Sequence, residues 1–337
     1  MKMNSMEEEN TQQPEIIAGE TPRIPIVGQL GILAGILLLI FGSGYVPQVL
    51  ESFSAAEPEE EVAPVLPIVE IESPVEEVDH FAEIAIKAEA VYVWDVQSQT
   101  VLYKKNDHEQ LPLASVTKLM TALIAHEILS EETEIPITVS AIMQDGNSGL
   151  AEGETFSLFD ILNLTLLSSS NDGAYAVASA VGSTLVEEGG ADTFVEAMNI
   201  RASELGLNQT YYKNPTGLDI SKTEGGAYGS ARDVAFLMEY ILQNYPGILE
   251  HTKKESAQIG STAGVSHNIE NTNPTVSRID GLIGSKTGYT DIAGGNLAIA
   301  FDAAYNRPII VVVLGSTYTA RFEDVLALSS AARKTVK

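Results

Sequence analysis

The chain has 337 residues, with 46 acidic and 19 basic side chains and a formal net charge of −27, so we expect no nucleic-acid partner because phosphates would be repelled. The absence of cysteine excludes disulfides, thiolate metal sites and a cysteine nucleophile. The five histidines show no metal-ligand spacing, so we expect neither a metal nor another cofactor.

The first 80 residues divide into three parts that precede a globular region. Residues 1–23 are polar and acidic and predict a cytoplasmic tail. Residues 24–46 form an apolar run without charge, which as a helix would reach about 35 Å and span a hydrocarbon layer of about 30 Å. Residues 47–80 are rich in glutamate and proline, which is typical of an extended, solvated stalk.

The apolar segment has two interpretations that both export the globular region. As a retained anchor it follows Arg23, and the next cation is Lys87, so the positive-inside rule places the N-terminus in the cytoplasm. As the core of a signal peptide it would be cleaved near Ser54-Ala55-Ala56. We favour the anchor over the signal peptide, because the length of the segment suits a membrane span. For the same reason we favour it over a third alternative, a buried core helix. This predicts a single-pass protein of the cell membrane with residues 81–337 outside the cytoplasm.

From about Phe81 the pattern becomes globular, with strands at both ends and helices between them. Strands are expected at 88–95, 100–105, 281–286, 296–302 and 308–314. Helices are expected at 115–129, 157–166, 172–181, 192–205, 230–243 and 321–334, two of them behind the capping boxes Ser157-x-x-Asp160 and Ser230-x-x-Asp233. This order predicts an α/β (α+β) domain over 81–337, in which an antiparallel sheet is flanked by helices and joined to a helical subdomain.

Ser115-Val116-Thr117-Lys118 places a serine and a lysine three residues apart near a predicted helix start. At this spacing both side chains share one helix face, so Lys118 can serve as base for a Ser115 nucleophile. The positive end of the helix dipole would favour the alkoxide. Apolar surroundings and nearby cations would lower the lysine pKa from about 10.4. By itself, the string is expected about once by chance in a chain of this length.

Ser169-Ser170-Asn171 lies between two predicted helices. The Ser169 hydroxyl could pass a proton between Lys118 and a leaving amine, and the Asn171 amide could hold either the Lys118 ammonium or a substrate carbonyl. A second serine-x-asparagine string, Ser266-His267-Asn268, does not lie at a helix junction and is interpreted as structural.

Lys286-Thr287-Gly288 follows at the end of a predicted strand, where the alternative is an ordinary turn. Lys286 and Thr287 could bind a carboxylate, and Gly288 would let a peptide lie close to the strand edge. The three strings in this order indicate a serine acyl-transfer site that attacks a carbonyl next to a free carboxylate.

Over residues 84–335 the chain resembles the D-alanyl-D-alanine carboxypeptidases, the low-molecular-mass penicillin-binding proteins among the penicillin-recognising serine enzymes. Further matching strings are Asn214-Pro215-Thr216-Gly217-Leu218 and Ser230-Ala231-Arg232-Asp233. The resemblance implies a β-lactamase/transpeptidase-like fold. It also implies a carboxypeptidase of cell-wall synthesis that removes the terminal D-alanine of peptidoglycan stem peptides and is inhibited by β-lactams.

The resemblance also implies a role for each site residue. Ser115 would be the nucleophile and Lys118 the general base, and Ser169 and Asn171 would assist proton transfer. Lys286 and Thr287 would bind the carboxylate next to Gly288. The backbone N–H groups of Ser115 and Tyr289 would form the oxyanion hole. Arg321 is a further candidate for the carboxylate, and Asn271-Thr272-Asn273 receives no role. Many relatives carry a C-terminal anchor after an extra all-β domain, so here we expect attachment to the membrane through residues 24–46.

Three alternative functions remain. A peptidoglycan D,D-endopeptidase that cuts cross-links carries the same motifs. A class A β-lactamase shares the first and third motifs but also needs a glutamate, in an E-x-x-L-N segment, that activates the deacylating water. We expect no such segment between Asn171 and Lys286. A wall-binding module with a vestigial site is disfavoured by the intact Ser115 and Lys118.

Overall fold

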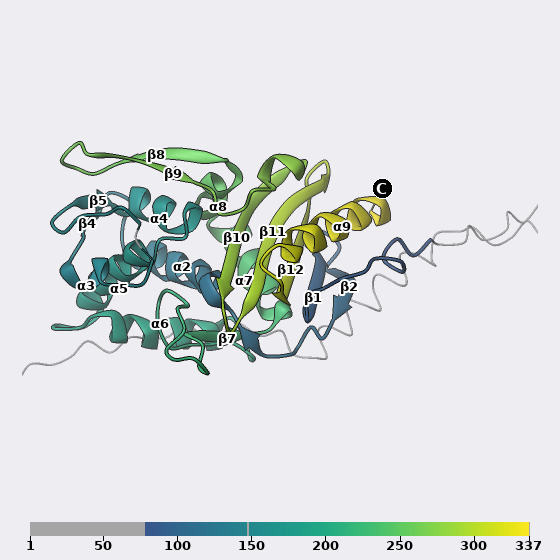
Figure 1. The fold of residues 1–337 in the computed structure, drawn as a ribbon, viewed down its shortest axis with the longest axis horizontal. Helices are drawn as coiled ribbons and strands as arrows, with labels where there is room; N and C mark the ends of the chain where they lie inside the picture. Colours follow the sequence, from purple (N-terminus) through teal and green to yellow (C-terminus); the bar gives the residue numbers. More distant parts are fainter. Residues whose placement is uncertain (1–77, 147, 337) are drawn as a thin grey trace, which may run out of the picture. The chain divides into compact units, whose positions relative to one another are not determined.

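The structure, a computed structural model, describes residues 78–146 and 148–336 (Figure 1). The predicted tail at 1–23, the predicted span at 24–46 and nearly all of the predicted stalk at 47–80 lie outside these residues, and they stay predictions. Among the helices that the structure does describe, none combines the length and apolar character needed to cross a membrane.

A five-stranded antiparallel sheet organises this part of the chain (Figure 1). In spatial order its strands are β10 (Leu282–Thr290), β11 (Gly294–Ala304), β12 (Arg307–Ser316), β1 (Ala90–Asp95) and β2 (Thr100–Lys105). The N-terminal hairpin thus pairs with the C-terminal strands through β1 and β12. The predicted strands and the antiparallel sheet are confirmed.

Helices cover both faces of the sheet. On one face α9 (Ala320–Thr335) packs against β11 and β12, around a core that includes Val311 and Val325. On the other face α7 (Ala231–Asn244) packs against β1 and β12, and Tyr92 and Val312 belong to that core. Because successive strand residues point to opposite faces, the apolar run of β12 is buried on both sides.

The middle of the chain forms the predicted helical lobe beside the sheet (Figure 1). Its longer helices are α2 (Lys118–Ile128), α4 (Leu158–Leu167), α5 (Asn171–Leu185) and α6 (Ala191–Glu204). Ser157, Ser170 and Ser230 cap α4, α5 and α7, and each side chain accepts a hydrogen bond from the backbone N–H three residues later. The capping boxes at Ser157 and Ser230 were predicted, because these signals are local.

Shorter elements were missed by the sequence reading. The short strands form a hairpin of β8 (Ser256–Gly260) and β9 (Ser266–Glu270), a small sheet of β3 (Leu111–Pro112), β6 (Tyr211–Tyr212) and β7 (Ala227–Gly229), and a pair of β4 (Glu134–Pro136) and β5 (Thr155–Ser157). The short helices are α3 (Val139–Ile142) and α8 (Gly247–Glu250). The 3-10 turns are η1 (Ala114–Thr117), η2 (His251–Lys253) and η3 (Val276–Arg278). The strands among them have two to five residues and largely polar or half-exposed side chains. They therefore lack the apolar alternation on which strand prediction depends.

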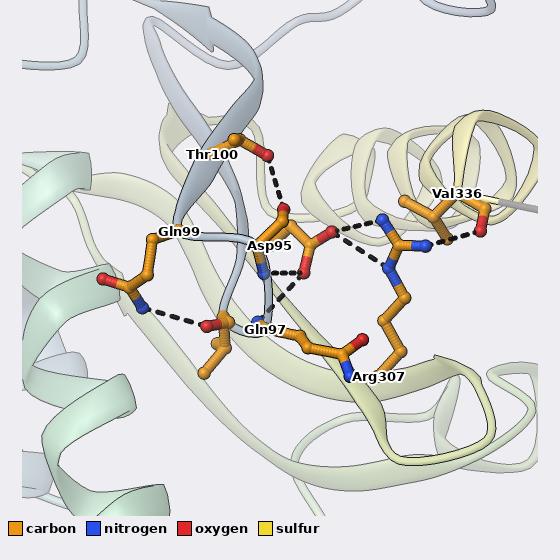
Figure 2. A network of polar contacts seen from close by, with 8 residues as sticks. Asp95, Gln97, Gln99, Thr100, Arg307 and Val336 are labelled. Atoms are coloured by element: carbon orange, nitrogen blue, oxygen red, sulfur yellow. Dashed lines mark hydrogen bonds and ion pairs between the residues drawn. The ribbon is translucent and has the colours of Figure 1, made fainter. Parts of the chain in front are cut away.

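A polar network joins the β1–β2 turn, the start of β12 and the end of α9, and Figure 2 shows its residues. Oδ1 of the buried Asp95 accepts hydrogen bonds from the backbone N–H groups of Gln97 and Ser98, and so fixes the β1–β2 turn. Its Oδ2 lies 3.0 Å from Nε and 2.8 Å from Nη2 of Arg307, whose Nη1 donates to the Val336 carbonyl after α9. Burial alone would raise the pKa of Asp95, but the bonds from Arg307 and Ser98 outweigh it and lower this pKa.

Candidate active site

Ser115 lies in a 3-10 turn, not in the first turn of the predicted α-helix. The turn η1 ends at Thr117, and α2 begins at Lys118. In a 3-10 helix residues three apart are eclipsed, which aligns Ser115 with Lys118 more directly than an α-helix would. Ala114 enters the turn with φ of +47°, an uncommon value for a residue that is not glycine. Strained backbone of this kind clusters at functional sites.

Lys118 is completely buried, and its amine touches only oxygen acceptors that are neutral. Its Nζ lies 2.9 Å from Ser115 Oγ, 2.7 Å from Asn171 Oδ1 and 2.7 Å from the Thr216 carbonyl oxygen. Burial and, next, the charge of Lys286 lower the pKa of Lys118 well below its usual range. A neutral amine has two hydrogens, which the two carbonyl-type oxygens take, so its lone pair faces the Ser115 hydroxyl.

The Thr216 carbonyl is a site group that the sequence analysis missed. Asn214 Oδ1 accepts hydrogen bonds from the N–H groups of Thr216 at 3.2 Å and Gly217 at 2.7 Å, which shapes the loop. Gly217 has φ of +78°, and a Cβ there would lie 1.9 Å from the Ala114 oxygen. The matching string around Asn214 therefore builds a loop that packs on η1 and presents a carbonyl to Lys118. A main-chain acceptor leaves no residue-type signal in a sequence.

The loop between α4 and α5 and the first residue of α5 each supply one contact to a buried lysine. Asn171 donates from Nδ2 to the Asp145 carbonyl at 2.6 Å, which leaves its Oδ1 for Lys118. Ser169, with φ of +64°, accepts a hydrogen bond from Lys286 Nζ at 2.9 Å. The sequence analysis expected Ser169 to work with Lys118, whereas its partner in the structure is Lys286.

Lys286 and Thr287 lie inside β10, which runs on to Thr290, and not at the end of the strand as expected. The Lys286 side chain is 1% exposed, and its Nζ also donates to the Thr287 carbonyl at 3.0 Å. Burial and, next, the charge of Arg321 lower the pKa of Lys286 to about 7. Lys286 therefore titrates near neutrality.

Gly288 has a second role that was not expected. A Cβ built there would lie 2.8 Å from the Leu113 carbonyl oxygen and 3.2 Å from Ser115 N. The missing side chain thus lets β10 approach η1, and the room that it would leave for a peptide stays a prediction. The approach brings the backbone before Tyr289 beside Ser115 N, where two N–H groups of an oxyanion hole are expected.

A hollow of about 240 Å³ opens at this junction. It is lined by Ser115, Ser169, Thr272, Thr287, Gly288, Tyr289, Tyr318 and Arg321. Arg321, on α9, is 4% exposed, donates from Nη1 to the Gly288 carbonyl at 2.5 Å, and lies 4.9 Å above the Tyr318 ring. Thr272 is a second lining residue to which the sequence analysis gave no role.

The predicted site residues therefore meet in one place. They are Ser115, Lys118, Ser169, Asn171, Lys286, Thr287, Gly288 and Tyr289. The second serine-x-asparagine string lies apart, in β9, where His267 Nε2 is 2.9 Å from Glu154 Oε1. In the ranges 78–146 and 148–336, no group of three or more His, Asp or Glu side chains is placed to hold a metal.

One expectation about the sequence was wrong, because the chain does contain an E-x-x-L-N string, Glu204-Leu205-Gly206-Leu207-Asn208. Its glutamate ends α6 with a 56% exposed side chain and pairs with Arg201 at 2.9 Å. Arg201 also binds Glu127, which lies on α2 nine residues beyond Lys118, or about 14 Å along the helix. Glu204 is therefore not among the residues that line the hollow.

Comparison with known proteins adds a family to this geometry. A family model described as D-alanyl-D-alanine carboxypeptidase matches residues 76–318. D-alanyl-D-alanine carboxypeptidase DacF of Bacillus subtilis is 32% identical over 70% of this chain, which spans only 59% of that protein. A D-alanyl-D-alanine endopeptidase of Escherichia coli is 30% identical over 68% of this chain and 71% of its own length.

Solved structures have the same fold. A D-alanyl-D-alanine carboxypeptidase of Mycobacterium tuberculosis superposes with a TM-score of 0.65 at 25% identity, over 74% of this chain and 92% of that one. Penicillin-binding protein D2 of Listeria monocytogenes, in its ampicillin-bound form, superposes with a TM-score of 0.62 at 26% identity, over 75% and 99% of the two chains.

Proposed function

Because this chain belongs to the D-alanyl-D-alanine carboxypeptidase family, we propose that it is a serine-type carboxypeptidase that removes the terminal D-alanine of peptidoglycan stem peptides. The observation that carries the proposal is the placement of Lys118 Nζ, 2.9 Å from Ser115 Oγ and otherwise bound to two obligate acceptors. The Ser115 hydroxyl is the one proton donor among these three contacts, so the placement suits Lys118 as a base for Ser115.

Acylation begins when the Ser115 hydroxyl gives its proton to neutral Lys118 and attacks the carbonyl between the two D-alanines. The resulting ammonium has three hydrogens, and three acceptors already surround it. The Ser115 and Tyr289 N–H groups stabilise the oxyanion, a contribution of typically about 10²–10³ in rate for each donor. Lys286, Thr287 and Arg321 bind the terminal carboxylate.

The leaving D-alanine needs a proton on its nitrogen. The Ser169 hydroxyl lines the hollow and accepts from Lys286, so it can donate its own hydrogen to that nitrogen and recover one from Lys286. After D-alanine leaves, Lys118 releases the proton it took from Ser115 to solvent, and Lys286 takes one back from solvent. Water then attacks the ester and gives a proton to the neutral Lys118, which passes it to Ser115 Oγ as the ester bond breaks and so frees Ser115. Both lysines suit proton transfer because burial lowers the pKa of each, that of Lys286 to about 7.

The same hydroxyl would be acylated by β-lactams, which carry a carboxylate beside a reactive carbonyl. The ampicillin-bound relative from Listeria supports this part of the proposal. A β-lactamase is less well supported, because Glu204 pairs with Arg201 instead of lining the hollow. A D,D-endopeptidase stays the closest alternative, since a relative from Escherichia coli carries that name.

Labelling and product analysis test the proposal together. The wild-type chain should bind a fluorescent penicillin and release D-alanine from a pentapeptide stem, whereas Ser115→Ala and Lys118→Ala should do neither while keeping the wild-type circular dichroism spectrum. Mass analysis of purified muropeptides separates D-alanine release from cleavage of cross-linked dimers. Normal labelling of Lys118→Ala would refute the base, and exclusive cleavage of dimers would replace the carboxypeptidase with the endopeptidase.

We also propose that residues 24–46 anchor the protein in the cell membrane with residues 81–337 on the outer side. Support comes from the uncharged length of this segment and from Arg23 before it. The full-length chain should stay in the membrane fraction after alkaline carbonate extraction, and its intact mass should include the N-terminus. A mature chain that begins near residue 57 would instead establish the cleaved signal peptide.

A further inference from the structure

The turn Asn271-Thr272-Asn273 is fixed by its two asparagines. Asn271 donates from Nδ2 to two carbonyl oxygens at the end of η2, each at 2.8 Å, and accepts from Asn273 N at 2.8 Å. Asn273 is buried, and its Oδ1 accepts from the Thr275 hydroxyl at 2.6 Å. The Asn271 amide and the Asn273 side-chain oxygen thus fix the turn and its neighbours, whereas Thr272 lines the active-site hollow.

Thr272 connects two walls of that hollow. Its Oγ1 lies 2.6 Å from Thr287 Oγ1 on β10 and 3.4 Å from the Leu167 carbonyl oxygen at the end of α4. Its backbone N–H also donates to the Leu167 carbonyl, at 3.1 Å, so the residue is held in place. The short contact between the two hydroxyls is the strongest of these contacts by distance.

The protons of these hydroxyls can be counted. Each threonine has one hydroxyl hydrogen, and the Leu167 carbonyl can only accept. Either hydroxyl can donate in the 2.6 Å contact, but both contacts are hydrogen bonds at once only when Thr272 donates to Leu167 and Thr287 donates to Thr272, an arrangement that turns the Thr287 hydrogen away from the hollow. A bound carboxylate also only accepts, so Thr287 can bind it only after its hydrogen turns toward the ligand.

We infer that Thr272 is a positioning residue that reverses the direction of its hydrogen bond with Thr287, so that Thr287 can donate to the ligand. In this way Thr272 sets the selectivity for a free C-terminal carboxylate. When the ligand arrives, Thr272 exchanges its 3.4 Å contact with Leu167 for donation to Thr287 at 2.6 Å. Thr287 then donates to the carboxylate as the middle of a chain of aligned hydrogen bonds, which strengthen one another. The inference rests on the proposed function, because it concerns the carboxylate of that substrate.

The test compares two substrates that differ only at the C-terminus, an acylated D-alanyl-D-alanine peptide and the same peptide ending in D-alaninamide. Thr272→Val, which keeps the β-branched shape, should lower kcat/KM about tenfold for the carboxylate and less than twofold for the amide. Thr272→Ser keeps the hydroxyl and should therefore keep the wild-type ratio of kcat/KM for the carboxylate substrate to kcat/KM for the amide substrate. Thr275→Val removes a hydroxyl from the same turn but away from the hollow, and it should leave the ratio unchanged even if it lowers the melting temperature.

A double-mutant cycle locates the effect. In a Thr287→Val background, Thr272→Val should cause no further loss on the carboxylate substrate, because the partner hydroxyl is already gone. Should Thr272→Val fail to fold, Thr272→Ala removes the same hydroxyl and is measured in its place. The inference alone is overturned if Thr272→Val loses kcat/KM equally on both substrates. It is also overturned if an active variant without the Thr272 hydroxyl keeps the wild-type ratio of the two kcat/KM values. A wild-type chain that releases neither D-alanine from the carboxylate substrate nor D-alaninamide from the amide substrate overturns the proposed function with it.

Discussion

At the scale of residues, the site consists of two buried lysines whose hydrogen-bond partners are hydroxyl and carbonyl oxygens. Lys118 and Lys286 are 0% and 1% exposed, and burial is the first cause of the lowered pKa of each. The unfolded chain, in which lysine has a pKa of about 10.4, therefore binds more protons than the folded chain between about pH 7 and pH 10. Over that window these lysines make the free energy of unfolding rise with pH.

The pKa of about 7 for Lys286 predicts an alkaline limb in substrate binding. Of the two protonation states of Lys286, only the ammonium attracts the substrate carboxylate. KM for a D-alanyl-D-alanine peptide should therefore rise above about pH 7, by at most tenfold for each pH unit and by less where Arg321 and Thr287 still bind the carboxylate. Lys286→Arg stays charged throughout, because arginine has a pKa above 12. Its KM should be independent of pH from 7 to 9, although its rate will be lower. An unchanged alkaline limb in Lys286→Arg would assign that limb to another group.

At the scale of elements, the site depends on the junction at which η1 meets β10. The 3-10 turn aligns Ser115 with Lys118, and Gly288 lets the strand approach to within contact of the Ser115 backbone. Since β10 is an edge strand of the sheet, its outer side is not used for pairing with another strand of the sheet. An extended peptide can therefore lie along β10 with its C-terminus toward Thr287.

Elements with strong local signals were predictable from the sequence. The buried run of β12, the hairpin of β1 and β2, and the serine caps of α4 and α7 depend on residues close together in the chain. The motif residues were predictable because their chemistry is carried by side chains in short strings. Their meeting was expected from the resemblance, and the contacts between Lys118 and Asn171 and between Lys286 and Ser169 agree with it.

The groups that were missed share a different property, namely that their role comes from contacts distant in sequence. The Thr216 carbonyl serves Lys118 from 98 positions away, and Thr272 meets Thr287 across a turn whose asparagines look like ordinary loop residues. Ser169 pairs with Lys286, which lies 117 positions away on β10, instead of with Lys118. Neither residue type nor spacing determines such contacts.

At the scale of the whole described molecule, one sheet separates two apolar cores. The core under α9 and the larger core of the helical lobe lie against opposite faces of the same strands. The hollow lies at the edge of that sheet, where β10, η1, the turn before α5 and the start of α9 converge. Residues that hold the sheet layer together are therefore expected to affect stability without touching the chemistry.

Asp95 and Arg307 provide a test of this separation, because neither lines the hollow and together they join the β1–β2 turn, β12 and the end of α9 (Figure 2). Arg307→Met leaves the fully buried Asp95 carboxylate without its cation, and should lower the free energy of unfolding by about 2 kcal/mol at pH 7. This is less than the about 3–5 kcal/mol of fully buried pairs because the Arg307 side chain is 30% exposed.

The pH dependence of that loss has a defined sign. The pKa of Asp95 is lowered in the folded chain, so the stabilisation by Arg307 is present above the unfolded value of about 3.9 and disappears as the pH falls through the folded value. The unfolding free energies of wild type and Arg307→Met in urea should therefore differ at pH 7 and begin to converge as the pH falls below about 4, while kcat/KM under folding conditions stays within twofold. A difference in stability that is equal at both pH values would mean that Arg307 acts through the Val336 carbonyl and its packing, and not through the charge of Asp95.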